Sequence, residues 1–335
     1  MGLLEMSKTQ NKKDFGSAIL EGFEYLLNNH EDVFVIGQGL WSPWYVGNSM
    51  TDLDKKFGNE RIIDTPVSEA GCTGAAVGAS LAGMRPIVVH PRMDFMLYAI
   101  DPIVNQAAKW SHMFGGQAKA GVTIRAIINR GGEQGAQHSQ ALHSWFAHIP
   151  GLRVVMPSTV KDARDLLIAS VLCPDPVLYI DDRWLYSQID TLEPPSLKSL
   201  SSFAPSLRQQ GNDVTIVGSG YSALLASEVA MKAKDSGIEA DVIDVMVLNP
   251  FDPELIVKSV EKTGRLLVID GGWSNCGFSG EIIASVSERV LPSKLKAKPQ
   301  RVTLPDAPAP CSPGLEKIYY PTSDNILLKL KGLVI

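Results

Sequence analysis

Short apolar runs alternate with longer amphipathic segments along the first half of the chain. The runs have the length of buried strands, and the segments between them repeat apolar residues every three or four positions, as helices do. The predicted strands are VFVIG (33–37), RPIVVH (85–90), VTIRAII (122–128), LRVVMP (152–157) and PVLYID (176–181). The predicted helices cover residues 14–29, 69–83, 94–113, 138–147 and 159–172. This alternation favours an α/β fold built on a parallel sheet.

The alternation stops at TLEPPSLKSLSSFAPSLRQQGND (191–213), which is rich in Pro and Ser, and then begins again. Such a segment predicts a linker. After it come predicted strands at 214–219, 240–245, 265–270 and 301–305, and predicted helices at 220–236, 253–263, 278–290 and near 323–333. We therefore expect a first domain over 1–190, a linker over 191–212, and a smaller α/β domain over 213–335.

Composition excludes several classes of protein. The chain has 335 residues, 45% hydrophobic and 20% charged, with a net charge of −5 and no basic cluster, which argues against a nucleic-acid partner. No apolar run is long enough to cross a membrane, and the N-terminus lacks the apolar core of a secretory signal. The four cysteines are far apart and form no C-x-x-C pair, so neither a zinc site nor a disulfide framework is indicated. A reducing, cytoplasmic location is expected.

In the segment IIDTPVSEAGCTGAAVGASLAGMR (62–85), one acidic residue, Glu69, lies where an extended stretch turns into a run of small residues. Ser68 is placed as the N-cap of a helix, and the helix then contains several glycines. Each glycine costs about 1 kcal/mol relative to Ala in a helix interior, a cost that close approach of another backbone or a flat ligand would explain. The alternative is that Glu69 only favours the helix dipole and that the small residues are ordinary packing.

Several long motifs in order resemble one protein family. They are DTPVSEAG (64–71), AIDPIVNQAAKW (99–110) and AQHSQALHSWFAHIPGLRVVMPST (136–159), followed by DVTIVGSGYSALLASEVA (213–230), EADVIDVMVLNPFD (239–252) and CSPGLEKIYYPT (311–322). The family is the beta subunit of the thiamine-diphosphate-dependent, decarboxylating component of 2-oxo acid dehydrogenases, which is transketolase-like. The resemblance implies an N-terminal parallel-sheet pyrimidine-binding domain and a smaller C-terminal transketolase-type domain.

The resemblance also assigns roles to residues of the first domain. A glutamate at the position of Glu69 hydrogen-bonds N1′ of the cofactor's aminopyrimidine and so promotes loss of the proton from thiazolium C2. Phe95 lies where the family stacks an aromatic ring on the pyrimidine, although it could instead be the first core residue of its helix. His138 matches a histidine of the active-site channel that helps bind substrate or acyl acceptor, the alternative being a helix-start residue bonded to backbone. His148 also matches a family position but is read as structural.

Other positions depart from the family. Gln38 replaces a usual acid near the cofactor, and the aromatic stretch 40–50 replaces a glycine-rich one. Arg92 and Arg130 add cations near the expected substrate entrance, where they could pair with a phosphate or carboxylate or simply be surface charges. His143 is a further candidate, expected one helical turn from His138.

The chain contains no G-D-G…N motif, by which this class of enzyme holds magnesium and diphosphate. The segment IDGGWSN (269–275) has the wrong order and spacing for that motif. The resemblance therefore implies thiamine diphosphate shared with an alpha subunit that holds Mg²⁺, with no metal held by this chain. It also implies beta–beta association through helix 69–83 and the C-terminal domain, giving an alpha-two, beta-two tetramer, and a lipoyl acyltransferase as acyl acceptor.

The expected function is decarboxylation of a 2-oxo acid and transfer of its acyl unit. A split transketolase-like or acyloin-forming transferase that acts on a sugar or small aldehyde is the alternative, favoured by the altered loops around Arg92 and Arg130. A non-catalytic homologue is the third reading, and the retention of Glu69 inside an intact motif argues against it.

Overall fold

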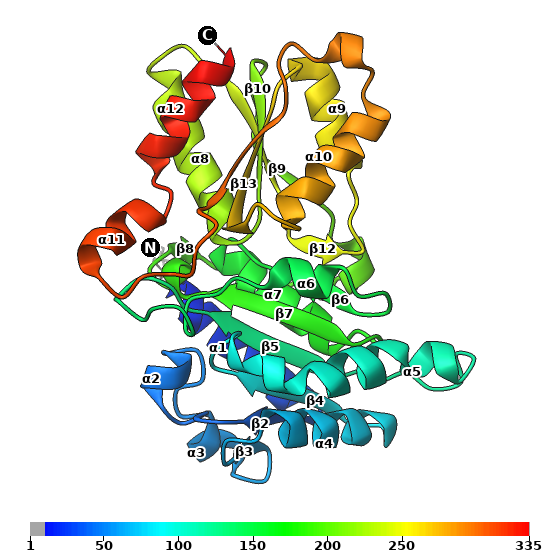
Figure 1. Ribbon diagram of the computed structural model, residues 1–335. Coiled ribbons are helices and arrows are strands. Elements are labelled where there is room, and N and C mark those ends of the chain that lie inside the picture. Colours follow the sequence, from blue (N-terminus) through cyan, green and yellow to red (C-terminus); the bar gives the residue numbers. More distant parts are fainter. Residues whose placement is uncertain (1–10, 335) are drawn as a thin grey trace, which may run out of the picture.

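The computed structural model describes residues 11–334 and has two α/β lobes, one above the other in Figure 1. Residues 1–10, where the sequence predicts no secretory signal, lie outside the described range, as does residue 335. One sheet has seven strands in the order β12-β6-β7-β5-β4-β2-β3, and the other has five in the order β14-β13-β10-β11-β9. A separate antiparallel pair joins β1 (Lys12–Asp14) to β8 (Ile189–Thr191). The predicted α/β class is confirmed.

The seven-stranded sheet is parallel except at one edge, where β12 runs antiparallel to β6. All six residues of both β5 and β7 are buried, as expected for a parallel sheet covered on both faces. The strands are β2 (Val33–Gly37), β3 (Ile62–Asp64), β4 (Arg85–His90), β5 (Thr123–Ile128), β6 (Arg153–Val155), β7 (Val177–Asp182) and β12 (Val247–Asn249).

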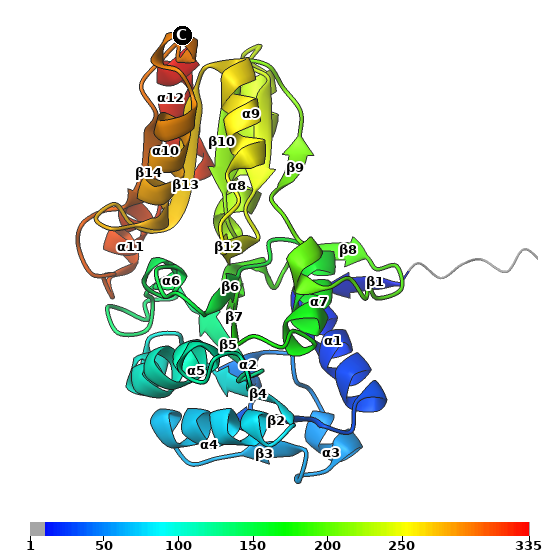
Figure 2. The same ribbon diagram turned by 90° about the vertical axis from the view of Figure 1, so that its right-hand side faces the viewer.

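Two groups of helices cover this sheet. On one face α1 (Phe15–Asn29) packs against α7 (Val160–Val171), and on the other lie α4 (Glu69–Leu81), α5 (Ala108–Met113) and α6 (His143–Ala147) (Figure 2). Helix α1 begins where Asp14 accepts a hydrogen bond from the amide of Ser17 at 2.7 Å. Its largest fully buried residues recur at helical spacing, which explains why the chain is amphipathic there: Phe15, Ile19, Phe23 and Leu26.

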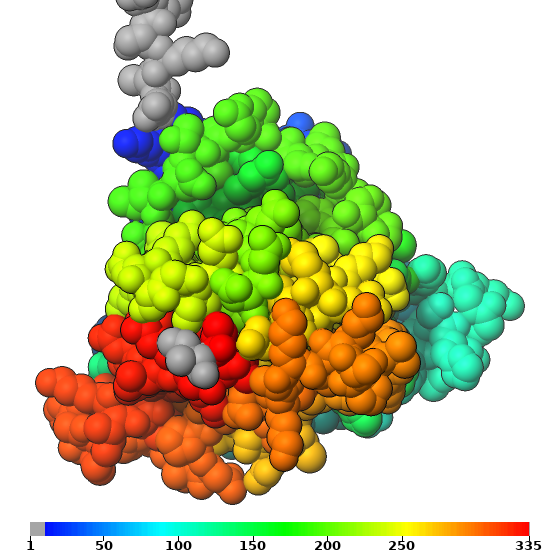
Figure 3. All heavy atoms as spheres, turned by 90° about the horizontal axis from the view of Figure 1, so that it is seen from above, coloured from blue at the N-terminus to red at the C-terminus, as the bar shows by residue number. Residues whose placement is uncertain are grey.

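The single helix predicted over 94–113 is wrong in detail. A 3-10 segment η1 (Phe95–Ala99) is followed by a π-helical segment η2 (Asp101–Ala107) and then by α5. Pro102 lies in the first turn of η2 and has no amide hydrogen, so the regular pattern of helical hydrogen bonds cannot run through it. The turn after α5 protrudes from the molecule, in turquoise in Figure 3.

The predicted helix 138–147 is also shorter than expected, because only α6 is helical. Residues 129–142 form a loop that contains three glycines with positive φ, namely Gly131 (73°), Gly132 (67°) and Gly135 (73°). Glycine adopts this left-handed backbone without steric cost, whereas a helix cannot pass through it. His138 follows these glycines in the same loop, and the helix begins only at His143.

The five-stranded sheet has α8 and α12 on one face and α9 and α10 on the other (Figure 1). Its strands are β9 (Ser206–Gln209), β10 (Val214–Gly218), β11 (Ala240–Asp244), β13 (Leu266–Trp273) and β14 (Gln300–Leu304). Its helices are α8 (Tyr221–Lys234), α9 (Glu254–Thr263), α10 (Phe278–Arg289), α11 (Pro313–Tyr319) and α12 (Ser323–Val334). Within residues 11–334, no helix combines the length and apolar character needed to cross a bilayer.

Two strands do not fit the predicted division into a first domain, a linker and a second domain. β9 falls inside the predicted linker 191–212, yet it pairs antiparallel with β11 and closes an edge of the second sheet. β12 follows β11 in the chain, yet it pairs with β6 of the first sheet. The short helices α2 (Pro43–Val46) and α3 (Leu53–Phe57) were not predicted, nor were the 3-10 turns η3 (Arg183–Leu185), η4 (Leu200–Ser202) and η5 (Pro292–Lys294).

Candidate active site

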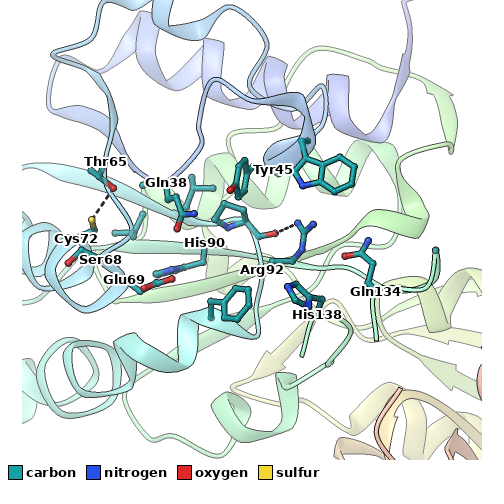
Figure 4. A pocket seen from close by; sticks show the side chains of 17 residues that line it. Gln38, Tyr45, Thr65, Ser68, Glu69, Cys72, His90, Arg92, Gln134 and His138 are labelled. Atoms are coloured by element: carbon teal, nitrogen blue, oxygen red, sulfur yellow. Dashed lines mark hydrogen bonds between the residues drawn. The ribbon is translucent and has the colours of Figure 1, made fainter. Parts of the chain in front are cut away.

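A cavity of about 410 Å³ opens at the carboxyl ends of β2 and β4, a size within the range of small-molecule sites. This edge of a parallel sheet is where ligands commonly bind. The cavity wall is formed by the loop after β2, the start of α4, the end of β4 with the turn after it, and the loop 129–142 (Figure 4). Five residues predicted from the sequence line it together: Gln38, Glu69, Arg92, Phe95 and His138.

Glu69 is the first residue of α4 and is partly buried at the cavity wall. Ser68 is the N-cap as predicted, but its side chain makes no capping hydrogen bond. Among residues 11–334, no side chain or backbone group forms a hydrogen bond or ion pair with the Glu69 carboxylate. Its oxygens are therefore available to a ligand, while the helix N-terminus favours its negative charge.

Phe95 and His138 form one side of the cavity. Their ring centroids are 5.2 Å apart and the rings are nearly perpendicular, at 84°. Asp94, which the sequence reasoning missed, holds the two segments together: its Oδ1 accepts hydrogen bonds from the backbone amide of Gln140 at 3.1 Å and from Gln140 Nε2 at 3.0 Å. The turn that carries Phe95 is thus fixed to the loop that carries His138.

Arg130 does not face the cavity, contrary to the expectation for a substrate residue. Its side chain is buried and forms an ion pair with Asp182 at 2.7 Å. It also lies over the ring of Trp184, 5.4 Å from the centroid, and donates to the carbonyl of Gly271 at 3.4 Å. Arg130 therefore anchors the start of the loop 129–142 to the second lobe.

His143 is likewise turned away from the cavity, because the loop before it removes the predicted helical turn from His138. Its Nε2 lies 3.0 Å from Oδ1 of Asp270 in β13, and both side chains are buried. Burial alone would raise the pKa of Asp270, but His143 and the backbone amides of Gly272 and Ser279 lower it to about 2. His143 thus anchors the other end of the loop, and Asp270 in IDGGWSN has a structural partner.

The wall opposite Phe95 is aromatic and polar. Gly39 has φ +68°, and the ring of Tyr45 packs so closely on it that an added Cβ would lie 2.6 Å from ring atoms. This contact places Tyr45 beside Gln38 at the cavity, and Trp44 next to it is 74% exposed. The stretch 40–50, which departs from the family pattern, therefore builds part of the site.

His90 is a cavity residue that the sequence analysis did not select. It ends β4, is buried, and its Nε2 lies 3.2 Å from Oγ1 of Thr73 in α4. Burial lowers the pKa of His90 to about 4, so the ring is neutral at pH 7. The only sequence signal for it was its position at the end of an apolar strand.

This pKa predicts an acid-sensitive fold. Below pH 6.5 the unfolded chain binds a proton at His90 that the folded chain does not bind until about pH 4, so stability should fall as the pH drops through this interval. At pH 5 the loss attributable to His90 is about 2 kcal/mol. Denaturant unfolding of the wild type and His90→Asn at pH 7.5 and pH 5 measures it. His112 is exposed, so His112→Asn should lose as much stability between pH 7.5 and pH 5 as the wild type does. If His90→Asn lost as much as the wild type, His90 would not be the source of the pH dependence.

Comparisons with known proteins agree with this architecture. Residues 11–188 match the family model "Transketolase, pyrimidine binding domain", and residues 204–326 match "Transketolase, C-terminal domain". A solved structure described as a split gene transketolase, inactive beta4 tetramer, superposes with a TM-score of 0.76 at 20% identity and covers 96% of this chain and 98% of that one. At that identity, the likeness shows the fold.

Curated relatives are more similar in sequence. The beta subunit of acetoin:2,6-dichlorophenolindophenol oxidoreductase from Bacillus subtilis is 36% identical over 322 residues, covering 92% of this chain and 94% of the relative. The human mitochondrial beta subunit of the pyruvate dehydrogenase E1 component is 33% identical over 318 residues, covering 94% and 88%. The corresponding yeast subunit is 34% identical over 314 residues, covering 92% and 85%. The chain therefore belongs to the transketolase-like family of thiamine-diphosphate-dependent enzymes, among the beta subunits of 2-oxo acid dehydrogenases.

Proposed function

We propose that this chain supplies the pyrimidine side of a thiamine diphosphate site and that Glu69 is its catalytic carboxylate. The observation that carries the proposal is the Glu69 carboxylate, which has no hydrogen-bond or ion-pair partner within residues 11–334 and lines the same cavity as the Phe95 ring. A carboxylate and an aromatic face are the groups needed to bond a protonated ring nitrogen and to stack a pyrimidine. When bound, thiamine diphosphate supplies the electron sink for cleavage next to a carbonyl.

The remaining cavity residues have simpler roles in this proposal. His138, held edge-on to Phe95, donates a hydrogen bond to the substrate carboxylate or carbonyl oxygen. Gln38 contributes a neutral amide beside the cofactor, where the family usually has an acid. Phe95 orients the ring, and the aromatic side chains of Trp44 and Tyr45 limit water at the opening.

We further propose an alpha subunit that binds the diphosphate and Mg²⁺. The sequence has no G-D-G…N motif, and residues 11–334 contain no group of three His, Cys, Asp or Glu side chains arranged to hold a metal. Helix α4 presents a stripe of exposed small residues at helical spacing: Ala70, Gly71, Gly74, Ala75 and Gly78. An added Cβ at Gly74 or Gly78 would meet nothing within 4 Å, so another backbone has room to approach there, which supports beta–beta contact in an alpha-two, beta-two tetramer.

The proposed reaction is decarboxylation of a 2-oxo acid with transfer of the acyl unit to a lipoyl group of an acyltransferase, in the cytoplasm. The second candidate is an acyloin-forming or split transketolase-like transfer to a sugar or small aldehyde. A specific observation favours this second candidate as well: a buried arginine, Arg92, lies on the cavity wall and could bind a phosphate or carboxylate.

A substrate screen of the reconstituted alpha–beta complex separates these reactions. Pyruvate and longer 2-oxo acids should be consumed when lipoamide is the acceptor, with release of CO₂. Product formation only with aldehyde acceptors would favour the second candidate. Absence of both reactions in a complex that binds thiamine diphosphate would contradict the proposed function.

A further inference from the structure

Four arginine side chains are buried in the described part of the chain, and one of them has no acidic partner. Arg125 pairs with Asp181 at 2.8 Å, Arg130 with Asp182 at 2.7 Å, and Arg164 with Glu21 at 2.7 Å and Asp165 at 2.9 Å. Each of the four leaves one nitrogen without a hydrogen-bond acceptor, but three are neutralised by a carboxylate. Within residues 11–334, Arg92 forms no ion pair, although only 9% of its surface is exposed.

The contacts of Arg92 leave much of its guanidinium unused. Its Nη1 donates to the carbonyl of the adjacent Pro91 at 3.1 Å, and its Nε has no acceptor. Burial and then the nearby positive charge of Arg183 lower the pKa of Arg92. A buried cation without a counter-charge is costly, and proteins normally pair it. Within the described part of the chain, Arg92 is thus a positive charge at the cavity wall that no ion pair neutralises.

Arg183 adds a second positive charge nearby, and it too forms no ion pair with any residue between 11 and 334. Arg183 follows β7, donates to the carbonyl of Trp44 at 3.1 Å and to Oδ1 of Asn129 at 3.3 Å, and lies over the ring of Tyr186. All of these partners are neutral, so they fix its position without cancelling its charge. The charge of Asp94 partly offsets this effect on Arg92, but the two form no ion pair: Asp94 Oδ1 accepts from Gln140 and its buried Oδ2 has no hydrogen-bond partner among the described residues.

Arg92 lies on the side of the cavity that also holds Tyr45, Gln134 and His138, whereas Glu69 and Cys72 lie at the other side (Figure 4). A ligand that spans the cavity from the side of Glu69 would therefore extend its far end toward Arg92. A guanidinium in this position binds carboxylate or phosphate oxygens with paired, charge-assisted hydrogen bonds.

We propose that Arg92, with the charge of Arg183 nearby, binds an anionic group, carboxylate or phosphate, on the substrate at the end remote from the reacting carbonyl. The inference rests on the proposed function and narrows its substrate class to compounds with a charged tail. It applies to either candidate reaction, since the charged tail can belong to the 2-oxo acid donor or to the aldehyde acceptor.

The test uses the reconstituted alpha–beta complex with thiamine diphosphate and two matched pairs of substrates. In the donor arm 2-oxoglutarate is compared with 2-oxopentanoate, and in the acceptor arm glycolaldehyde phosphate is compared with glycolaldehyde. The wild type should prefer the charged member in at least one arm. In Arg92→Met the KM of that charged member should rise about 10- to 100-fold with a small change in kcat, so that the preference is lost. Arg92→Lys keeps the positive charge but not the paired N–H donors of the guanidinium. The KM of the charged substrate should therefore rise less in Arg92→Lys than in Arg92→Met.

Arg289→Met is the matched control, because Arg289 is exposed on α10 in the second lobe and should leave both preferences as in the wild type. A wild type that prefers the charged member in neither arm would overturn the inference without any variant. Equal KM changes for charged and uncharged members in Arg92→Met would also overturn it, because Arg92 would then bind the reacting end or act on the fold. If the wild type still exchanged the C2 proton of bound thiamine diphosphate, the proposed function would stand even though the inference about Arg92 was wrong.

Discussion

Glu69→Gln should lower turnover of the reconstituted complex by about 100- to 10,000-fold, the range typical of lost general acid–base catalysis. Glutamine has the size of glutamate and can still hydrogen-bond, so cofactor affinity should fall only modestly. It has no negative charge, however, and cannot favour a protonated ring nitrogen next to it. Steady-state turnover and calorimetric titration with thiamine diphosphate measure the two effects separately.

The alternative role of Glu69, support of the helix dipole, makes a different prediction. It gives a stability loss of about 0.3–1 kcal/mol with activity retained. Glu254→Gln is a matched control, because Glu254 is the exposed first residue of α9 and has the same relation to its helix. The dipole account would be supported if both variants lost similar stability and neither lost activity.

The isolated chain should bind thiamine diphosphate weakly and show no turnover, and addition of the alpha subunit should restore both. The described cavity offers groups for a pyrimidine ring, Glu69 and Phe95, but no set of carboxylates for Mg²⁺. Because the diphosphate and its metal contribute much of the binding, we expect the dissociation constant of the isolated chain to be weaker by a factor of about 100 or more, equivalent to about 3 kcal/mol. Calorimetry with and without Mg²⁺ measures it.

Tight, magnesium-dependent binding by the isolated chain would contradict a shared site. The oligomeric state of the active species is a further check, since the proposal requires two alpha and two beta chains. A species with one of each, measured by mass and small-angle scattering, would remove the beta–beta contact through α4 from the account.

Much of the fold was predictable because its signals are local. Buried parallel strands such as β5 and β7 are continuous apolar runs, and α1 shows its apolar face in the spacing of Phe15, Ile19 and Phe23. The predictions were wrong where the hydrophobic pattern of a segment did not determine its backbone conformation or its pairing partner. Residues 138–142 have a helix-like sequence but follow glycines in left-handed conformations, and β12 is too short and its partner β6 too distant in sequence for pairing to be read from pattern.

The sequence predicted those site residues that lie in motifs resembling the family. Glu69, Phe95 and His138 come from three separate segments that the structure brings to one cavity. The roles of Arg130 and His143 depended on contacts with Asp182 and Asp270, which the sequence does not reveal. Both residues hold the loop that carries His138.

The most direct test of the central claim, that Glu69 activates thiamine diphosphate in a site shared with an alpha subunit, is the rate of hydrogen–deuterium exchange at C2 of the bound cofactor. This rate needs no substrate and is measured by rapid quench and NMR in the reconstituted complex. We predict that exchange in Glu69→Gln falls with turnover, by about 100-fold or more, in a complex that remains folded and loaded. Exchange at the wild-type rate in that complex would contradict the account.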